Sequence, residues 1–221
     1  MFGGTVHIYQ ALHALSILCA LLTIGIVVAI AIKDPAVARR PTIRISAWMA
    51  ATNIIVALTY LTRLSQPVRE QSGHDKIAFR VLIWMHMSMY LAFTFLATCI
   101  TTHLMLIALL HRHRLAARLD RYYEVISFSL ALGISALSFV FYKDVVWDPA
   151  HLDLAVTATG MPTAAALMLS EFVWEIPCIG FCAVAGGLVA MRLKLILLRI
   201  QSADLAATNN ARNDPGPAAS S

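Results

Sequence analysis

Two glutamates, Glu171 and Glu175, stand one helical turn apart in an apolar stretch that also holds Trp174 and Pro177. Carboxylates in such surroundings are costly unless they face water, a cation or a polar partner. The favoured interpretation places both at a membrane–water interface, where tryptophan also concentrates and carboxylates are simply hydrated. The alternative is a site for a cation or a protonated ligand near the outer half.

Three histidines, His13, His86 and His103, also lie in or near apolar stretches. Neutral imidazole ligates haem iron across helical bundles, which defines a haem-binding hypothesis. His86 and His103 are 17 residues apart, about 25 Å along one helix, so each would need a partner on another helix. Because His13 offers only one such partner, the sequence favours hydrogen bonds between helices, shared with Asn53.

Cationic side chains gather in the run HRHR at residues 111–114 and again at Arg121. Lysine and arginine beside an apolar run usually anchor a helix at a membrane surface and report its orientation. We therefore interpret the run as an anchor on the cytoplasmic side. The alternative is that Arg112, Arg114 and Arg121 form a face that contacts lipid phosphate or a cytoplasmic partner.

The composition indicates the environment in which these side chains act. Hydrophobic residues make up 59% of the 221 residues and charged residues 13%, and the mean hydropathy is +0.73. Soluble domains are about 45–50% apolar and about 25% charged. The composition excludes a disordered chain, a disulfide scaffold and an ordinary soluble enzyme. We expect an integral membrane protein without enzymatic activity, cofactor, metal site or nucleic-acid partner, surrounded by the lipid bilayer.

Five apolar segments reach the length of about 20 residues that a membrane-spanning helix needs, or come close to it. They comprise residues 8–32, 45–61, 81–110, 123–142 and 165–198. The sequence therefore predicts an all-α fold, a bundle of five transmembrane helices within residues 1–200. The polar remainder, residues 201–221, is predicted to be a disordered tail because it can bury little apolar surface.

The distribution of basic residues predicts how the bundle is oriented. With the N-terminus outside, twelve lysines and arginines fall on the inner side and five on the outer side. Inner loops carry an excess of positive charge in membrane proteins. We therefore expect an outer N-terminus and an inner C-terminus.

Small residues within the apolar segments suggest where helices could approach closely. Gly25 with Ala29, and Ala183 with Gly187, have the four-residue spacing of close helix contacts. The cysteines show no C-x-x-C pattern and read as small apolar residues. They are Cys19, Cys99, Cys178 and Cys182.

Four short motifs resemble the first five helices of a fungal seven-helix G-protein-coupled-receptor-like protein. They are ARRPTIRIS at residues 38–46, TCITTHLMLIALLH at residues 98–111, LDRYYEV at residues 119–125, and Trp147-Asp148-Pro149 before a proline-bearing segment. The resemblance extends over roughly residues 8–200. It implies a multi-pass receptor of the plasma membrane that transmits a signal to a cytoplasmic signalling protein.

The resemblance also implies a binding site for a small-molecule or peptide ligand in the outer half of the bundle. The residues expected there are Asn53, Met89, Glu171, Trp174 and Glu175. The inner face would use Arg112, Arg114 and Arg121.

The chain departs from that family in two respects. Receptors of this kind usually carry a cysteine at the outer end of the third helix and another in the following outer loop, but residues 76–90 and 143–165 have none. A sixth and a seventh helix are also missing, so we expect a truncated or degenerate receptor-like chain without ordinary G-protein coupling. The alternatives are a small transporter, a channel subunit or a membrane scaffold, and a haem-binding redox protein.

Overall fold

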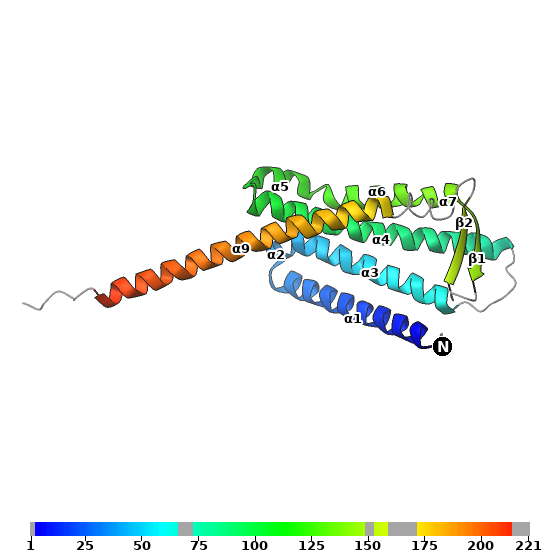
Figure 1. Ribbon diagram of the computed structural model, residues 1–221, viewed down its shortest axis with the longest axis horizontal. Helices are drawn as coiled ribbons and strands as arrows, with labels where there is room; N and C mark the ends of the chain where they lie inside the picture. Colours follow the sequence, from blue (N-terminus) through cyan, green and yellow to red (C-terminus); the bar gives the residue numbers. More distant parts are fainter. Residues whose placement is uncertain (1–2, 66–72, 149–152, 159–171, 214–221) are drawn as a thin grey trace, which may run out of the picture.

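The computed structural model describes residues 3–65, 73–148, 153–158 and 172–213, and its helices lie side by side in an elongated bundle (Figure 1). Four of the described helices are long and apolar enough to cross a membrane. These spans are Gln10–Lys33, Pro41–Thr62, Ile77–Ala108 and Val173–Ser202. The structure thus agrees with the expectation of a helical, multi-pass membrane protein.

The first two spans form a helical hairpin. Helix α1 (Gly3–Lys33) is followed by the short α2 (Pro35–Ala38) and by α3 (Pro41–Ser65). Asp34 caps α2, because its side chain accepts hydrogen bonds from the backbone amides of Ala36 and Val37, at 3.0 and 3.2 Å. A proline at the first helical position and an aspartate before it are a common start for a helix. The predicted end of the first segment near Lys33 is therefore confirmed.

Helix α4 (Gly73–Ala108) is the central element of the bundle. It packs against α3, against α6 and against α9, and its two ends contact α5 and strand β1. Its 36 residues correspond to about 54 Å, well beyond a hydrocarbon core of about 30 Å. We call the end that contacts α5 the inner end and the end that contacts β1 the outer end (Figure 1).

The fourth segment differs from the prediction of one helix over residues 123–142. It is divided into α6 (Tyr123–Ser135) and α7 (Leu137–Phe141). Ser135 Oγ donates to the carbonyl of Leu132 at 3.2 Å, and the amide of Ala136 donates to the same carbonyl at 3.1 Å. A serine hydroxyl that bonds back to its own helix tends to bend it. The described residues therefore contain four continuous spans and a shorter apolar helix, α6.

A two-stranded hairpin occupies the outer loop that follows. Strand β1 (Tyr142–Asp148) pairs in an antiparallel manner with β2 (Asp153–Ala158), and Asp148 is the register partner of Asp153. The prediction of an all-α fold did not include this hairpin. The hairpin contacts the outer ends of α3 and α4 (Figure 1).

Helix α9 (Val173–Asn213) is the last element, and it is longer than the predicted segment. It continues through residues 201–213, where the sequence analysis expected the start of a disordered tail. This stretch contains neither glycine nor proline and is rich in alanine, the best helix former, so nothing in it ends the helix. The C-terminal half of α9 projects beyond the inner end of the bundle (Figure 1).

Small side chains line the contact between α4 and α6. Ser127, Ala131 and Ser135 follow one another at four-residue spacing on α6, and all three are fully buried. Ser135 Oγ lies 2.6 Å from the hydroxyl of Ser88 on α4. Ala131 packs in a cluster with Leu91 and Ala92. Small residues let two helices approach closely and let their hydroxyl groups pair.

The pairs of small residues that the sequence analysis selected lie elsewhere. A Cβ atom added at Gly25 or at Gly187 would meet nothing within 4 Å, and Ala29 and Ala183 are exposed. The prediction of close helix contacts at these two pairs is therefore wrong for the described bundle.

Candidate functional site

The inner end of the bundle holds a three-residue ionic cluster, which we call the inner clamp: Arg44, Asp120 and Glu124. Arg44 Nε donates to Glu124 Oε1. Arg44 Nη2 donates to Asp120 Oδ1 at 2.9 Å and to the carbonyl of Asp120 at 3.2 Å. A single guanidinium thus joins α3 to the end of α5 (His113–Asp120) and to the first turn of α6.

Local sequence explains why the clamp forms there. Arg44 lies in the first turn of α3 and Glu124 in the first turn of α6, where a carboxylate is favoured by the helix dipole. The planar guanidinium can donate to two carboxylates at once, which the ammonium of lysine cannot do in the same geometry. About a third or less of each side chain is exposed. The clamp therefore ties three helices together at the inner end.

Two buried polar side chains, His103 and Tyr123, lie next to the inner clamp. His103 on α4 meets the ring of Tyr123 edge-on, with 5.8 Å between the ring centroids. Within the described residues, His103 Nδ1 and Tyr123 Oη are buried and make no hydrogen bond. Cys99 Sγ lies 3.5 Å from Ser127 Oγ beside them. These contacts continue the link between α4 and α6 below the clamp.

The turn from α4 to α5 shapes the inner surface. His111 has φ of 51°, a left-handed conformation that is uncommon outside glycine and asparagine. Arg192 on α9 donates to the carbonyl of Leu109 at 3.1 Å and lies 2.7 Å from His111 Nε2. The guanidinium therefore covers the carboxyl end of α4 and attaches α9 to the turn, a favourable place for a cation.

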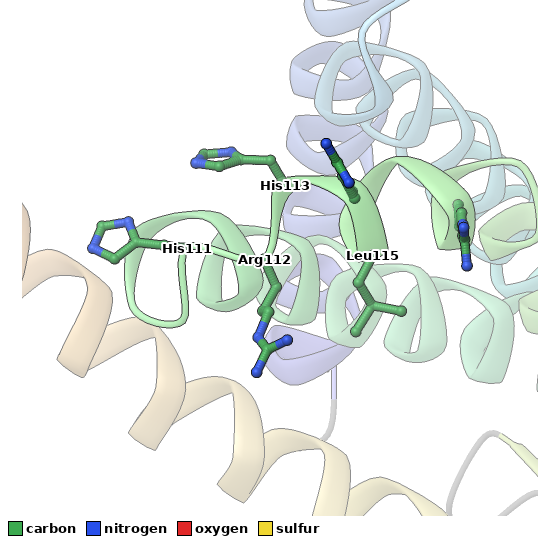
Figure 2. A pocket seen from close by; sticks show the side chains of 6 residues that line it. His111, Arg112, His113 and Leu115 are labelled. Atoms are coloured by element: carbon green, nitrogen blue, oxygen red, sulfur yellow. The ribbon is translucent and has the colours of Figure 1, made fainter.

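An open pocket of about 530 Å³ surrounds this turn, and we call it the basic pocket. It is lined by His111, Arg112, His113, Arg114, Leu115 and Arg118. Figure 2 shows Arg112 and Leu115 extending to the same side of the turn, and His113 to the other. The lining contains five basic or imidazole side chains and one leucine, so its electrostatic preference is for anions.

The three arginines proposed as one partner face separate in the structure. Arg112 and Arg114 line the basic pocket. Arg121 lies outside that lining, at the corner between α5 and α6, where its guanidinium carbon stands 5.0 Å from the ring centre of Tyr122. The sequence Asp120-Arg121-Tyr122 does not act as a unit, because Asp120 belongs to the inner clamp.

The outer-half residues are also distributed over separate places. Asn53 Nδ2 donates to Ser16 Oγ at 2.8 Å, so its amide joins α3 to α1. Asn53 also lines a shallow groove of about 250 Å³ between these helices, together with Phe93 of α4.

The remaining members of that set lie on α4 and α9. Met89 is half-buried on α4, Trp174 is exposed, and Glu175 is buried with 5% of its surface accessible. Glu171 lies outside the described residues. The buried position of Glu175 contradicts the interpretation of that residue as a simply hydrated interfacial carboxylate.

Each histidine of the haem hypothesis has its own neighbour. The His13 ring stacks near Tyr60, with 4.1 Å between centroids, and His86 Nδ1 lies 2.9 Å from Thr59 Oγ1. His103 meets Tyr123. Within the part of the chain that the structure describes, no group of three or more histidine, cysteine or acidic side chains is arranged to hold a metal. These contacts agree with the expectation that the histidines join helices.

All four cysteines are free, as the sequence pattern indicated. Cys182 Sγ on α9 lies 3.7 Å from Thr98 Oγ1 on α4, which places it in a helix contact. The reading of Cys182 as a small packing residue therefore agrees with its position.

Sequence reasoning missed the pairing of Arg44 and the roles of Arg118 and Arg192. All three were counted as membrane anchors, because a count of basic residues does not show which acid each one meets. The signal that could have revealed the clamp is the pair of acids, Asp120 and Glu124, on the side rich in arginine. Comparison with models of known protein families and with curated protein sequences gives no match for this chain.

Proposed function

We propose that this chain is a non-enzymatic, receptor-like protein of the plasma membrane that contacts a cytoplasmic signalling protein at its inner end. The observation that carries the proposal is the position of α4, which contacts the outer hairpin at one end and α5 at the other. A single packed helix therefore joins the two surfaces between which a receptor must transmit a change. The outer surface would take a small-molecule or peptide ligand near Trp174 and Glu175.

The inner clamp supports this proposal because it fixes the inner surface to the bundle. Through Arg44 it holds the end of α5 and the start of α6 against α3. A shift of α4 or α3 would therefore be passed to α5.

The surface that we assign to the partner comprises Arg121 and Tyr122, and we call it the partner face. Both side chains are exposed, and Arg121 is stacked on Tyr122. Arginine and tyrosine are enriched at protein interfaces and frequently supply most of the binding energy. Arg112 and Arg114 line the basic pocket and are not part of this face.

A photo-crosslinking amino acid placed at Tyr122 tests the proposal in living cells. We expect it to capture a discrete soluble protein, and we expect the charge reversal Arg121→Glu to reduce that capture at least roughly tenfold, as loss of an interface hot spot does. The same crosslinker at Leu130, an exposed position on the apolar helix α6, is the matched control and should capture lipid only.

Three results of that experiment would contradict the proposal. The first is a well-inserted chain that captures no protein at Tyr122. The second is a capture that Arg121→Glu leaves unchanged. If Arg121→Glu instead prevents insertion, Arg121 is a topology anchor and the partner-face assignment fails.

One observation favours a second candidate function, transport of a proton or cation. Glu175 is buried within the span Val173–Ser202, and buried acids in membrane helices frequently mark ion pathways. In proteoliposomes, the receptor-like proposal predicts no proton or sodium flux above that of protein-free vesicles. A flux that Glu175→Gln abolishes would replace the receptor-like proposal with a transporter.

A further inference from the structure

We propose that the basic pocket binds the headgroup of a phosphorylated inositol phospholipid in the inner leaflet. This inference is independent of the receptor-like function, because it needs only a membrane-embedded chain whose turn between α4 and α5 faces the cytoplasm. It rests on the charge of the lining, on its sequence position and on the apolar side chains beside it.

Within the described part of the chain, no salt bridge neutralises the charges of the pocket. Among the residues that the structure describes, the salt bridges join Arg44 to Asp120 and Glu124, and they include none of Arg112, Arg114 and Arg118. No carboxylate lines the pocket. Three guanidinium groups around one concave surface can bind phosphate oxygens through forked hydrogen bonds, which is the geometry that arginine provides best.

The backbone at the pocket adds donors of the same kind. Arg112 is the N-cap residue of α5, and its side chain does not cap the helix. The first amides of a helix point outward and favour an anion. The left-handed conformation of His111 turns the chain sharply, so that this N-terminus and the arginine side chains share one concave surface.

The sequence position of the pocket, directly after the apolar span of α4, favours the level of the lipid headgroups. The apolar span of α4 ends at Ala108, and the pocket begins three residues later at His111. Basic pockets at this position between helices are the usual places where phosphorylated headgroups bind. A volume of about 530 Å³ is within the range of pockets for small molecules and leaves room for a sugar ring with more than one phosphate.

Apolar side chains next to the pocket favour a lipid over a soluble phosphate. Leu115, which lines the pocket, is 45% exposed, and Leu104 near the end of α4 and Leu110 in the turn after it are also exposed. A soluble phosphate compound would make no contact with these side chains. An acyl chain lying along α4 would cover them. One lipid molecule would therefore bind the arginines through its headgroup and cover the exposed leucines with its acyl chain.

The test uses the full chain in phosphatidylcholine nanodiscs that contain phosphatidylinositol bisphosphate, with bound lipid measured by native mass spectrometry and by titration. The pocket variant is R112Q/R114Q/R118Q. The matched control is K33Q/R39Q/R40Q, which removes three exposed basic residues from the turn between α1 and α3. We expect binding to weaken at least roughly tenfold in the pocket variant and less than roughly twofold in the control.

Each outcome decides the inference. Equal loss in the two variants, or equal binding of phosphatidylserine at matched total charge, would show general attraction to anionic membranes and overturn it. Soluble inositol trisphosphate that binds as tightly as the lipid would identify a free phosphate compound as the ligand and overturn the lipid assignment. Far-ultraviolet circular dichroism that is unchanged in the variants shows that the helices remain folded.

Discussion

Replacing Ala131 with leucine is expected to force α6 away from α4 and to lower the free energy of unfolding by about 3 kcal/mol. Ala131 has no accessible surface and packs with Leu91 and Ala92 of α4. The added atoms have no space to occupy, because the side chains of α4 already pack directly against Ala131. Separation of the helices would also break the 2.6 Å contact between Ser88 and Ser135.

The measurement is thermal or denaturant unfolding of the purified chain in nanodiscs, followed by circular dichroism. Gly133→Leu is the matched control, since Gly133 lies two residues further along α6 and a Cβ atom there meets nothing within 4 Å. We expect Gly133→Leu to keep or slightly raise stability, because leucine is a better helix former than glycine. Equal destabilisation by both variants would contradict the close packing of α4 on α6.

Removal of the clamp arginine, Arg44→Ala, is expected to lower the free energy of unfolding by about 2 kcal/mol. The variant loses hydrogen bonds to two carboxylates, and it leaves Asp120 and Glu124 near each other without a cation. The value lies between those of exposed and buried ion pairs, since the clamp side chains are partly exposed. Arg44→Lys should recover only part of the loss, because lysine cannot form the forked contact.

A double-mutant cycle separates the clamp from other effects of the substitution. Arg44→Ala, Glu124→Gln and the double variant should give an interaction energy of about 1 kcal/mol. Arg40→Ala is the control, because Arg40 is exposed and takes part in no salt bridge among the described residues. Additive losses in the cycle would show that Arg44 and Glu124 do not interact in the membrane.

The spans were predictable because length and hydropathy each act locally. A run such as Gln10–Lys33 must cross the membrane or be buried, and its end at Lys33 and Asp34 follows from charge and from a cap. The break at Ala136 was not predictable, because it depends on the contact of Ser135 with Ser88 of another helix. A hydropathy count treats that serine as only slightly polar.

The end of α9 was also not predictable from the sequence, for a different reason. Residues 201–213 have a composition that is typical of disordered tails, yet they continue a helix that is already nucleated. Extending a helix by one residue is much easier than starting one. The polar composition therefore did not predict where the helix ends.

Only part of the candidate site could be predicted from the sequence. The run at residues 111–114 indicated a basic surface, but its division into a basic pocket and a separate Arg121 depends on the turn at His111. Asn53 was expected to form hydrogen bonds between helices, and its bond to Ser16 of α1 confirms this, whereas its place in an outer ligand site stays a prediction. The facing side of a helix depends on its rotation against its neighbours, which a single sequence does not determine.

The most direct measurement is the sidedness of the inner end in intact cells. Ala117→Cys places an exposed thiol on α5, and a membrane-impermeant maleimide reports which side it faces, with the parent chain as the background for the native cysteines. The receptor-like proposal predicts labelling only after permeabilisation, together with an N-terminal epitope that antibodies reach without it. Labelling of Ala117→Cys in intact cells would place the partner face and the basic pocket outside the cytoplasm and contradict the proposal.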